Sequence, residues 1–270
     1  MGYINIDGKL QALQDAAIFA DNRAFRYGYG LFETMLVQDG VIQLAEYHCD
    51  RLWNGAAALY LQIPKLLTRE ALIQEVLRTV AKNKLEKCCR VRLQLYPGSG
   101  GFFDDVSQQA HYLIECFPLD PHVPELNETG LTIGIAEGLQ KSPDALANYK
   151  TTNALVYAIA AQQAKANKWN DALVCNTHGN IIESTIANIF WIKDHKVYTP
   201  LLTEGCVAGV MRRYIMEKTA VAESILTKET LLQADAVFLT NAIRRIKWVH
   251  KLGTTIYNHS VVQNIAQQIF

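Results

Sequence analysis

Two hydrophobic periods alternate along the chain, and together they predict a mixture of helices and strands. Apolar positions recur at helical spacing in residues 46–61, 68–83, 154–166, 209–217 and 228–233. Short alternating or continuous apolar runs, typical of strands, occupy residues 31–37, 41–44, 89–96, 111–117, 131–136, 172–176, 181–183, 189–193 and 236–240. Because both kinds of element occur in both halves, the pattern favours the α+β class, with mixed sheets and helices, over a doubly wound sheet.

Two Asp-Gly pairs predict β-hairpins near the amino terminus. Asp7-Gly8 lies where residues 3–8 meet residues 10–14, and Asp39-Gly40 joins residues 31–37 to residues 41–44. Aspartate and glycine both tolerate the positive φ that two-residue hairpin turns require. We therefore expect a tight turn at each pair.

The best candidate for a domain boundary lies between residues 118 and 130. Prolines at positions 118, 121 and 124 interrupt a polar stretch that ends at Gly130. We therefore expect a smaller N-terminal α/β domain at residues 1–119, a linker at residues 120–129 and a larger C-terminal domain at residues 130–270.

Composition excludes several classes of function. Of the 270 residues, 50% are hydrophobic and 19% are charged, which is typical of a globular chain. Lys plus Arg equals Asp plus Glu at 26 each, so no charge excess points to nucleic acid or to an anionic membrane. The first residues lack a secretory signal, no apolar run suits a membrane helix, and the six cysteines form no CxxC pair. We expect a cytoplasmic protein whose adjacent Cys88 and Cys89 pack in a strand.

Two segments carry the residues on which chemistry can depend. Lys150 lies in Asn148-Tyr149-Lys150-Thr151-Thr152-Asn153, and Glu183 follows the apolar run at residues 181–182. A lysine amine kept neutral can attack a carbonyl, and a carboxylate beside a ring nitrogen keeps that nitrogen protonated. Pyridoxal phosphate chemistry needs both roles. On local composition alone, Lys150 also fits a solvated lysine before a helix, and Glu183 fits a carboxylate at a strand end.

Other kinds of site are poorly supported by the sequence. The seven histidines show no HExxH or HxH pattern, so no metal site is expected. Gly28-Tyr29-Gly30 and Gly98-Ser99-Gly100-Gly101 do not open a helix after a buried strand, so neither is a dinucleotide fingerprint. No GxSxG motif supports a hydrolase.

The chain resembles the class IV (fold type IV) pyridoxal phosphate enzymes over nearly its whole length. The resemblance is carried by residues 21–35, by Lys150 with Asn153, by residues 183–190 and by residues 239–242. This family includes branched-chain and D-amino-acid aminotransferases and 4-amino-4-deoxychorismate lyase. The resemblance implies a two-domain fold like that of D-amino-acid aminotransferase, a cofactor-binding C-terminal domain, pyridoxal 5'-phosphate as cofactor and a homodimer.

The resemblance also implies roles for individual residues. Catalytic Lys150 would form a Schiff base with the cofactor, Glu183 would pair with its pyridine nitrogen, and Arg51 would contact its phosphate. The rest of the phosphate site would come from the backbone at Val210, Met211, Asn241 and Ala242. Relatives often have threonine at the positions of Met211 and Ala242, so side-chain contacts would be fewer here.

The substrate is expected to carry an amine and a carboxylate. Phe32, Arg92 and Arg244 are the candidate substrate-binding residues. Both arginines equally fit exposed positions, Arg92 on a strand and Arg244 in a loop, so their role stays open from the sequence alone.

Comparison with the branches of the family favours the lyase. Pro97 and Phe32 stand where the D-amino-acid enzymes have arginine and tyrosine, and Asn153 follows Lys150 one position earlier than in branched-chain enzymes. Residues 98–101 and 240–242 resemble the lyase, although Pro97 and Phe102 stand where it usually has arginines. We therefore expect pyruvate elimination to give 4-aminobenzoate, a step of folate biosynthesis. An amino-acid aminotransferase is the alternative, and a non-catalytic cofactor-binding homologue is a distant one.

Overall fold

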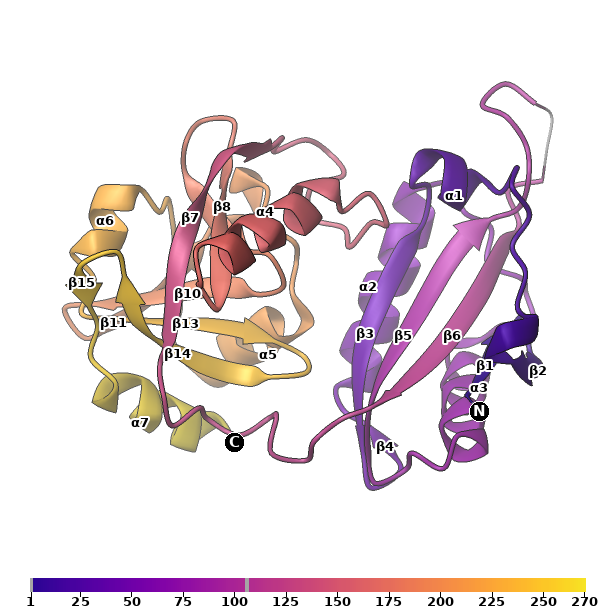
Figure 1. Ribbon diagram of the computed structural model, residues 1–270, viewed down its shortest axis with the longest axis horizontal. Coiled ribbons are helices and arrows are strands. Elements are labelled where there is room, and N and C mark those ends of the chain that lie inside the picture. The colour runs from indigo at the N-terminus through magenta and orange to yellow at the C-terminus, as the bar shows by residue number, and fades with distance from the viewer. Residues whose placement is uncertain (1, 105–106) are drawn as a thin grey trace. The chain divides into compact units, whose positions relative to one another are not determined.

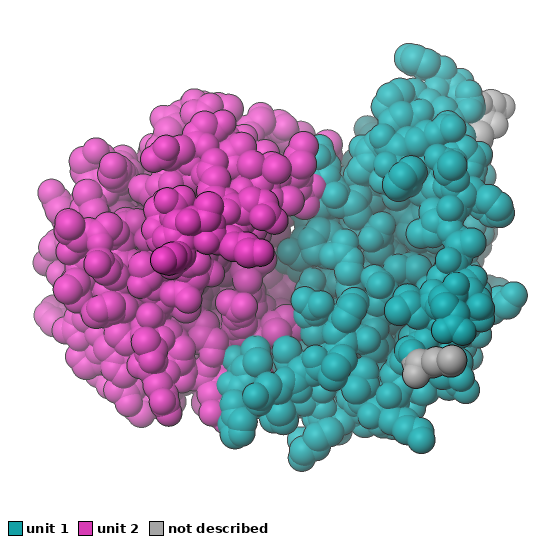
Figure 2. Space-filling model, in the orientation of Figure 1, with its two compact units in different colours: residues 1–123, 149–153 teal, residues 124–148, 154–270 magenta. Residues whose placement is uncertain are grey.

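The computed structural model describes residues 2–104 and 107–270, and the chain divides into two compact units. Unit 1 comprises residues 1–123 and 149–153, and unit 2 comprises residues 124–148 and 154–270 (Figure 2). The domain limits expected from the sequence stay a prediction. The two units meet between residues 123 and 124, inside the expected linker, and residues 149–153, which include Lys150, group with the N-terminal part of the chain.

Unit 1 contains a six-stranded antiparallel sheet among its described residues, in the order β2-β1-β6-β5-β3-β4 (Figure 1). Its strands are β1 (Tyr3–Ile6), β2 (Lys9–Ala12), β3 (Leu31–Gln38), β4 (Val41–Ile42), β5 (Cys88–Pro97) and β6 (Ala110–Pro118). Its helices are α1 (Arg23–Tyr27), α2 (Ala45–Ala58) and α3 (Arg69–Lys82), with the 3-10 turn η1 (Leu13–Asp15).

Both predicted hairpins are present. Asp7 and Gly8 have φ values of 50° and 82°, and Asp39 and Gly40 have φ values of 48° and 74°. Positive φ at both central residues is the type I′ geometry, whose twist matches that of the flanking strands. The Asp-Gly pairs therefore set the register of β1 with β2 and of β3 with β4.

The core of unit 1 lies between the sheet and its two long helices. On β5, Val91 and Leu93 are fully buried while Arg90 is exposed, as the alternation of the sequence predicts. These side chains pack with Leu52 of α2 and Val76 of α3. Burying each such apolar side chain contributes about 1.5–3 kcal/mol to stability. The cysteines at 88 and 89 are buried and unbridged, which confirms that they pack in the strand.

Unit 2 contains a nine-stranded mixed sheet among its described residues, and the strand pairings close six of its strands into a ring. The order is β12-β11-β10-β13-β14-β7-β8-β9, β15 pairs with β14, and the pairing of Glu183 with Asn188 joins β9 back to β10. The strands are β7 (Leu131–Lys141), β8 (Asp171–Asn176), β9 (Ile181–Ser184), β10 (Asn188–Lys193), β11 (Lys196–Pro200), β12 (Val221–Ser224), β13 (Ala236–Asn241), β14 (Arg245–Leu252) and β15 (Thr255–Ile256).

The helices of unit 2 pack around its sheet, and buried side chains among its described residues form two separate apolar clusters. They are α4 (Leu155–Ala166), α5 (Val210–Lys218), α6 (Lys228–Leu232) and α7 (Ser260–Ile269), with the 3-10 turn η2 (Leu202–Glu204). Small side chains, Ala160 and Ala164, let α4 pack closely on Ala172 and Val174 of β8. A separate apolar cluster includes Leu173, Ile189, Val237 and Val249. Among the described residues, no helix is long and apolar enough to cross a membrane.

Strand β7 is longer than the predicted strand at residues 131–136. Its pairing with β8 shifts register after Ile135, which lies opposite Leu173, and resumes at Gln140, opposite Cys175. Gly138 lies within this bulge and has a φ of 68°, a conformation that favours glycine. The bulge breaks the alternation on which the sequence prediction relied, and it carries the strand on to Lys141.

Candidate active site

Backbone hydrogen bonds hold the lysine segment of unit 1 against the start of β3. The amide of Phe32 donates to the carbonyl of Lys150 at 2.9 Å, and the amide of Thr152 donates to the carbonyl of Gly30 at 2.9 Å. The Thr152 hydroxyl also donates to the Gly28 carbonyl at 2.6 Å. The backbone around Lys150 is therefore held against the start of β3 by the kind of hydrogen bonds that join two strands.

The Phe32 ring brings two cations together in unit 1. The Lys150 Nζ lies 4.4 Å from the ring centroid, and the guanidinium carbon of Arg92 lies 4.0 Å from it. Burial lowers the pKa of Arg92, whose Nη2 donates to Gln94 Oε1 at 3.3 Å. Within the described residues Arg92 forms no ion pair, so its charge remains available to a carboxylate of a ligand. The structure thus brings together three of the predicted residues.

Arg51 is held by a buried acid that the sequence analysis did not identify. Its Nε donates to Glu33 Oε1 at 2.7 Å and its Nη2 to Glu33 Oε2 at 2.5 Å, while His48 Nδ1 lies 2.7 Å from Oε2. Burial alone would raise the pKa of Glu33, but Arg51 and His48 outweigh burial and lower it to about 2. This bidentate pair fixes the plane of the guanidinium. The phosphate-binding role of Arg51 stays a prediction.

Glu183 of unit 2 is buried and receives three hydrogen bonds. Its Oε1 accepts from Lys141 Nζ at 2.9 Å and from the Tyr157 hydroxyl at 2.7 Å. Its Oε2 accepts from the amide of Val207 at 3.0 Å. Three donors, one of them cationic, compensate a carboxylate that is removed from water. Such a carboxylate is preorganised to face a positively charged partner.

The Val207 amide also connects Glu183 to the amino terminus of α5. The carbonyl of Val207 accepts from Asn188 Nδ2 at 2.9 Å, and Gly209 follows as the N-cap residue without a side-chain cap. A Cβ at Gly209 would lie 1.8 Å from Asn188 Oδ1, so any larger residue in this turn would have to displace the Asn188 side chain. The first amides of α5, at Val210 and Met211, have no partner within the helix, which suits them to bind an anion.

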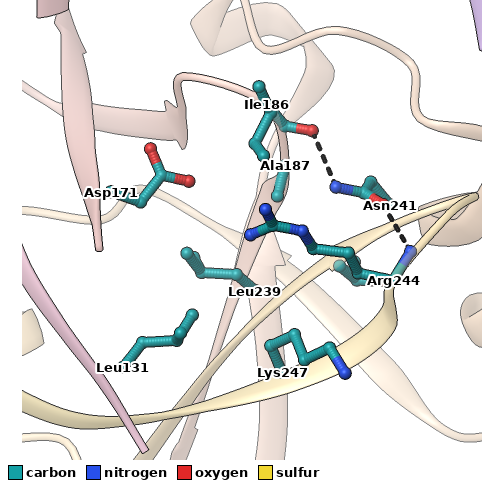
Figure 3. Close-up of a pocket in the computed structure, with 9 residues that line it drawn as sticks. Leu131, Asp171, Ile186, Ala187, Leu239, Asn241, Arg244 and Lys247 are labelled. Atoms are coloured by element: carbon teal, nitrogen blue, oxygen red, sulfur yellow. Dashed lines mark hydrogen bonds between the residues drawn. The ribbon is translucent and has the colours of Figure 1, made fainter. Parts of the chain in front are cut away.

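Two further predicted residues of unit 2, Asn241 and Arg244, line a pocket at the end of β13 (Figure 3). Asn241 Nδ2 donates to the Ile186 carbonyl at 3.2 Å, and Asn241 Oδ1 accepts from the Arg244 amide at 2.8 Å. Arg244 lines the pocket together with Asp171 and Lys247. Burial and the charge of Arg244 lower the pKa of Lys247. Ala242 follows Asn241 in the same turn, and its role stays a prediction.

Three residues at the candidate site were not predicted from the sequence: Lys141, Tyr157 and Glu33. Their partners lie 42, 26 and 18 residues away along the chain, respectively. Glu33 offered one signal, because it is a carboxylate in the apolar run at residues 31–37. Lys141 offered none, since the bulge that places it is invisible to hydrophobic periodicity.

Comparison with known proteins shows the family. The sequence model of the family described as amino-transferase class IV matches residues 30–252 of this chain. The chain belongs to the class IV aminotransferase family. Membership confirms the resemblance, the α+β fold and the expected dependence of this enzyme on pyridoxal phosphate.

Relatives of this class IV aminotransferase carry two different activities in their names. A Methanocaldococcus jannaschii protein, provisionally named a branched-chain-amino-acid aminotransferase, is 29% identical over 98% of this chain and 93% of its own length. An aminodeoxychorismate lyase of Vibrio harveyi is 29% identical over 82% of each chain. The crystal structure of a branched-chain aminotransferase from Thermoproteus uzoniensis with norvaline superposes with a TM-score of 0.89 over 99% of this chain and 93% of that one. Its identity is 23%, so it supports the fold alone.

The residues of each unit fit the cofactor of the family. Unit 2 presents a buried carboxylate, Glu183, and an open helix terminus after Gly209, which suit a protonated ring nitrogen and a phosphate. Unit 1 presents the Lys150 amine beside an aromatic ring. Two features suit this turn to bind an anion. There is no room for a Cβ at Gly209, and the helix amides that follow it have no side-chain cap.

Proposed function

We propose that this member of the class IV aminotransferase family is a 4-amino-4-deoxychorismate lyase, which eliminates pyruvate and releases 4-aminobenzoate. The observation that carries the proposal is the pair of basic side chains at the Phe32 ring, the Lys150 amine and the Arg92 guanidinium. One offers a base and the other a site for a carboxylate, as a substrate with both an amine and a carboxylate needs.

Each residue has a defined part in the proposed reaction. Bound pyridoxal phosphate supplies the electron sink for the carbon that loses its proton. Lys150 takes the ring proton, the electron pair left behind completes the aromatic ring, and the C–O bond to the enolpyruvyl group breaks. The proton then passes to the departing enolpyruvate, which leaves as pyruvate. Arg92 would bind a carboxylate of the substrate. With the cofactor bound, Glu183 would pair with its ring nitrogen, and the amides at Val210 and Met211 would hold its phosphate.

Two features favour the lyase over the other branches of the family. The glycine loop at residues 98–101 and the turn at residues 240–242 resemble the lyase. Phe32 leaves an apolar ring where D-amino-acid enzymes place a tyrosine hydroxyl, which argues against that branch.

A second candidate is an amino-acid aminotransferase of branched-chain type. The observation that favours it is the Methanocaldococcus jannaschii relative, which has the same 29% identity but covers 98% of this chain. In that reaction Lys150 would move the proton from the substrate Cα. A homodimer and a cytoplasmic location remain part of the proposal, and sedimentation of the purified protein at micromolar concentration tests the first.

The test is to mix cofactor-loaded protein with 4-amino-4-deoxychorismate and follow the fluorescence of 4-aminobenzoate. We expect product from the wild type and a loss of at least about a thousandfold in Lys150→Ala, because the variant lacks both the nucleophile and the base. If cofactor-loaded wild type yields no product, the lyase proposal is wrong. A panel of amino donors with 2-oxoglutarate then tests the aminotransferase.

A further inference from the structure

The Glu183 carboxylate is bound asymmetrically within unit 2. Two donors, Lys141 Nζ at 2.9 Å and the Tyr157 hydroxyl at 2.7 Å, share Oε1. A single donor, the Val207 amide at 3.0 Å, contacts Oε2. An ionised carboxylate has about four lone-pair sites, two on each oxygen. Oε1 is therefore saturated, and Oε2 retains capacity for one more donor.

Lys141 is built into this position by the bulge in β7. After the bulge, Lys141 lies opposite Asn176, and its ammonium group is held at two points. Besides its bond to Glu183, the ammonium donates to the Ala147 carbonyl at 2.8 Å. Its side chain is 15% exposed and that of Glu183 is 5% exposed, so this pair differs from a solvated surface ion pair.

Tyr157 of α4 supplies the second donor to Oε1. Burial, and then the nearby negative charge of Glu183, raise the pKa of Tyr157 well above its ordinary value, so its hydroxyl stays protonated. The Lys141 ammonium also lies 5.4 Å from the Tyr157 ring centroid, in the range of a cation–π contact. The two side chains therefore support each other as well as the carboxylate.

We propose that Lys141, together with Tyr157, is a positioning residue that fixes Glu183 by Oε1 and leaves Oε2 to meet the pyridine nitrogen of the cofactor. This inference rests on the proposed function, in which Glu183 faces that nitrogen. The Lys141 ammonium pairs with the buried carboxylate at 2.9 Å, and the Tyr157 hydroxyl, at 2.7 Å from the same oxygen, fixes the rotation of the carboxylate. Neither residue needs to touch the cofactor to affect how the ring nitrogen is held.

The experiment compares the binding of two cofactors to the apoprotein. One is pyridoxal phosphate, and the other is its 1-deaza analogue, in which carbon replaces the ring nitrogen. The ratio of the two dissociation constants, measured by absorbance or calorimetry, isolates the contact made at that nitrogen. We expect the wild type to prefer pyridoxal phosphate by about tenfold or more, as a charge-assisted hydrogen bond would provide.

Four variants test the proposed role. Lys141→Met should abolish most of the preference for the natural cofactor, and Lys141→Arg should retain it because the charge and a donor remain. Tyr157→Phe should reduce the preference in part, since the cation stays. Lys193→Met is the matched control, because Lys193 also forms an ion pair, with Asp235 at 3.5 Å, but lies away from Glu183. This control should keep the wild-type ratio.

The outcomes separate this inference from the proposed function. Wild-type protein that binds neither cofactor would contradict the proposed function. Wild type that binds both with equal affinity would overturn the inference, as would Lys141→Met weakening both cofactors equally, which indicates a structural role alone. If Lys141→Met does not fold, as judged by thermal unfolding of the apoprotein, Tyr157→Phe decides. An unchanged ratio in that variant then overturns the inference.

Discussion

Arg92 is the residue whose surroundings most directly suggest a contact with substrate. It is partly buried, lies 4.0 Å from the Phe32 ring centroid and forms no ion pair among the described residues. Arg90 lies two positions earlier on the same face of β5, but it is exposed. Its guanidinium carbon lies 4.5 Å from the ring centroid of Phe117. The pair therefore offers a site variant and a control on one strand.

We expect Arg92→Gln to raise the KM for a carboxylate substrate by about 10- to 100-fold, because a charged hydrogen bond is worth about 1.5–3 kcal/mol. The kcat should change much less if the carboxylate is bound equally in ground and transition states. Arg90→Gln should leave both parameters near wild type. Steady-state kinetics on the active substrate checks this, and equal effects of the two substitutions would refute the role of Arg92.

Glu33 should make a pH-dependent contribution to stability. Its pKa is lowered from 4.5 to about 2 in the folded protein, so its contribution is present above pH 4.5 and is lost as the pH falls towards 2. The shift corresponds to about 3 kcal/mol at neutral pH, to an order of magnitude. Glu33→Gln leaves the largely buried Arg51 with a weaker partner, so we expect a loss of about 3 kcal/mol at pH 7.

Urea unfolding at pH 7 and pH 3 tests this expectation. The wild type should lose more stability between the two values than Glu33→Gln does, because the variant has no carboxyl to protonate at this position. Both proteins share every other titrating group, so the difference between them isolates Glu33. Identical pH dependence of the two would contradict the lowered pKa of Glu33.

The sequence offered candidate site residues only where chemistry restricts the residue type. Lys150 and Glu183 were chosen because a nucleophilic amine and a buried carboxylate are rare requirements, and their pattern matches that of the family. Lys141 was not predicted, because its role arises from a register shift between two strands. A local pattern carries no information about such long-range pairing.

At the scale of elements, the sequence predicted most helices and strands of both units. Strand β14 was missed because Arg244-Arg245 suggested a loop, which hid the alternation that buries Ile246 and Trp248. Helix α7 was missed although Val262, Ile265 and Ile269 follow helical spacing and are buried. Strand β14 lies inside the sheet, between β13 and β7, and α7 lies near the carboxyl end of the chain. For both, packing against the rest of the unit decides whether a short segment forms.

The amino terminus of α5 gives a test of an element rather than of one contact. We expect Gly209→Ala to weaken the binding of pyridoxal phosphate by about tenfold or more, because the new Cβ would lie 1.8 Å from Asn188 Oδ1 and displace the first amides of the helix. It should also lower the Tm. Isothermal titration with the cofactor and thermal unfolding provide the measurements.

A double-mutant cycle identifies the clash with Asn188 as the cause. Asn188→Ala removes the obstructing atom together with its bond to the Val207 carbonyl. In that background Gly209→Ala should cost much less than it does in the wild type. Additive effects of the two substitutions would show that the glycine matters for another reason.

At the scale of the whole molecule, each unit has its own sheet and its own apolar core, and each contains cysteines. Unit 1 holds Cys49, Cys88, Cys89 and Cys116, and unit 2 holds Cys175 and Cys206. Burial raises the pKa of all six thiols, to about 11 for Cys49 and to about 12 for Cys89, Cys116 and Cys206. The thiolate is the reactive form, so these cysteines should be inert in the folded protein.

Alkylation with iodoacetamide at pH 8 therefore reports the opening of each unit. A thiol with a pKa of about 11 or 12 is less than about 0.1% thiolate at this pH, whereas an unperturbed thiol is ionised to roughly a quarter. We expect Cys49, Cys89, Cys116 and Cys206 to react at least about a hundredfold more slowly in native protein than in urea, as measured by mass spectrometry of digests. Because each unit carries its own reporters, intermediate urea concentrations reveal whether the two cores open together. Rapid labelling of Cys89 or Cys206 without urea would contradict the burial that raises their pKa.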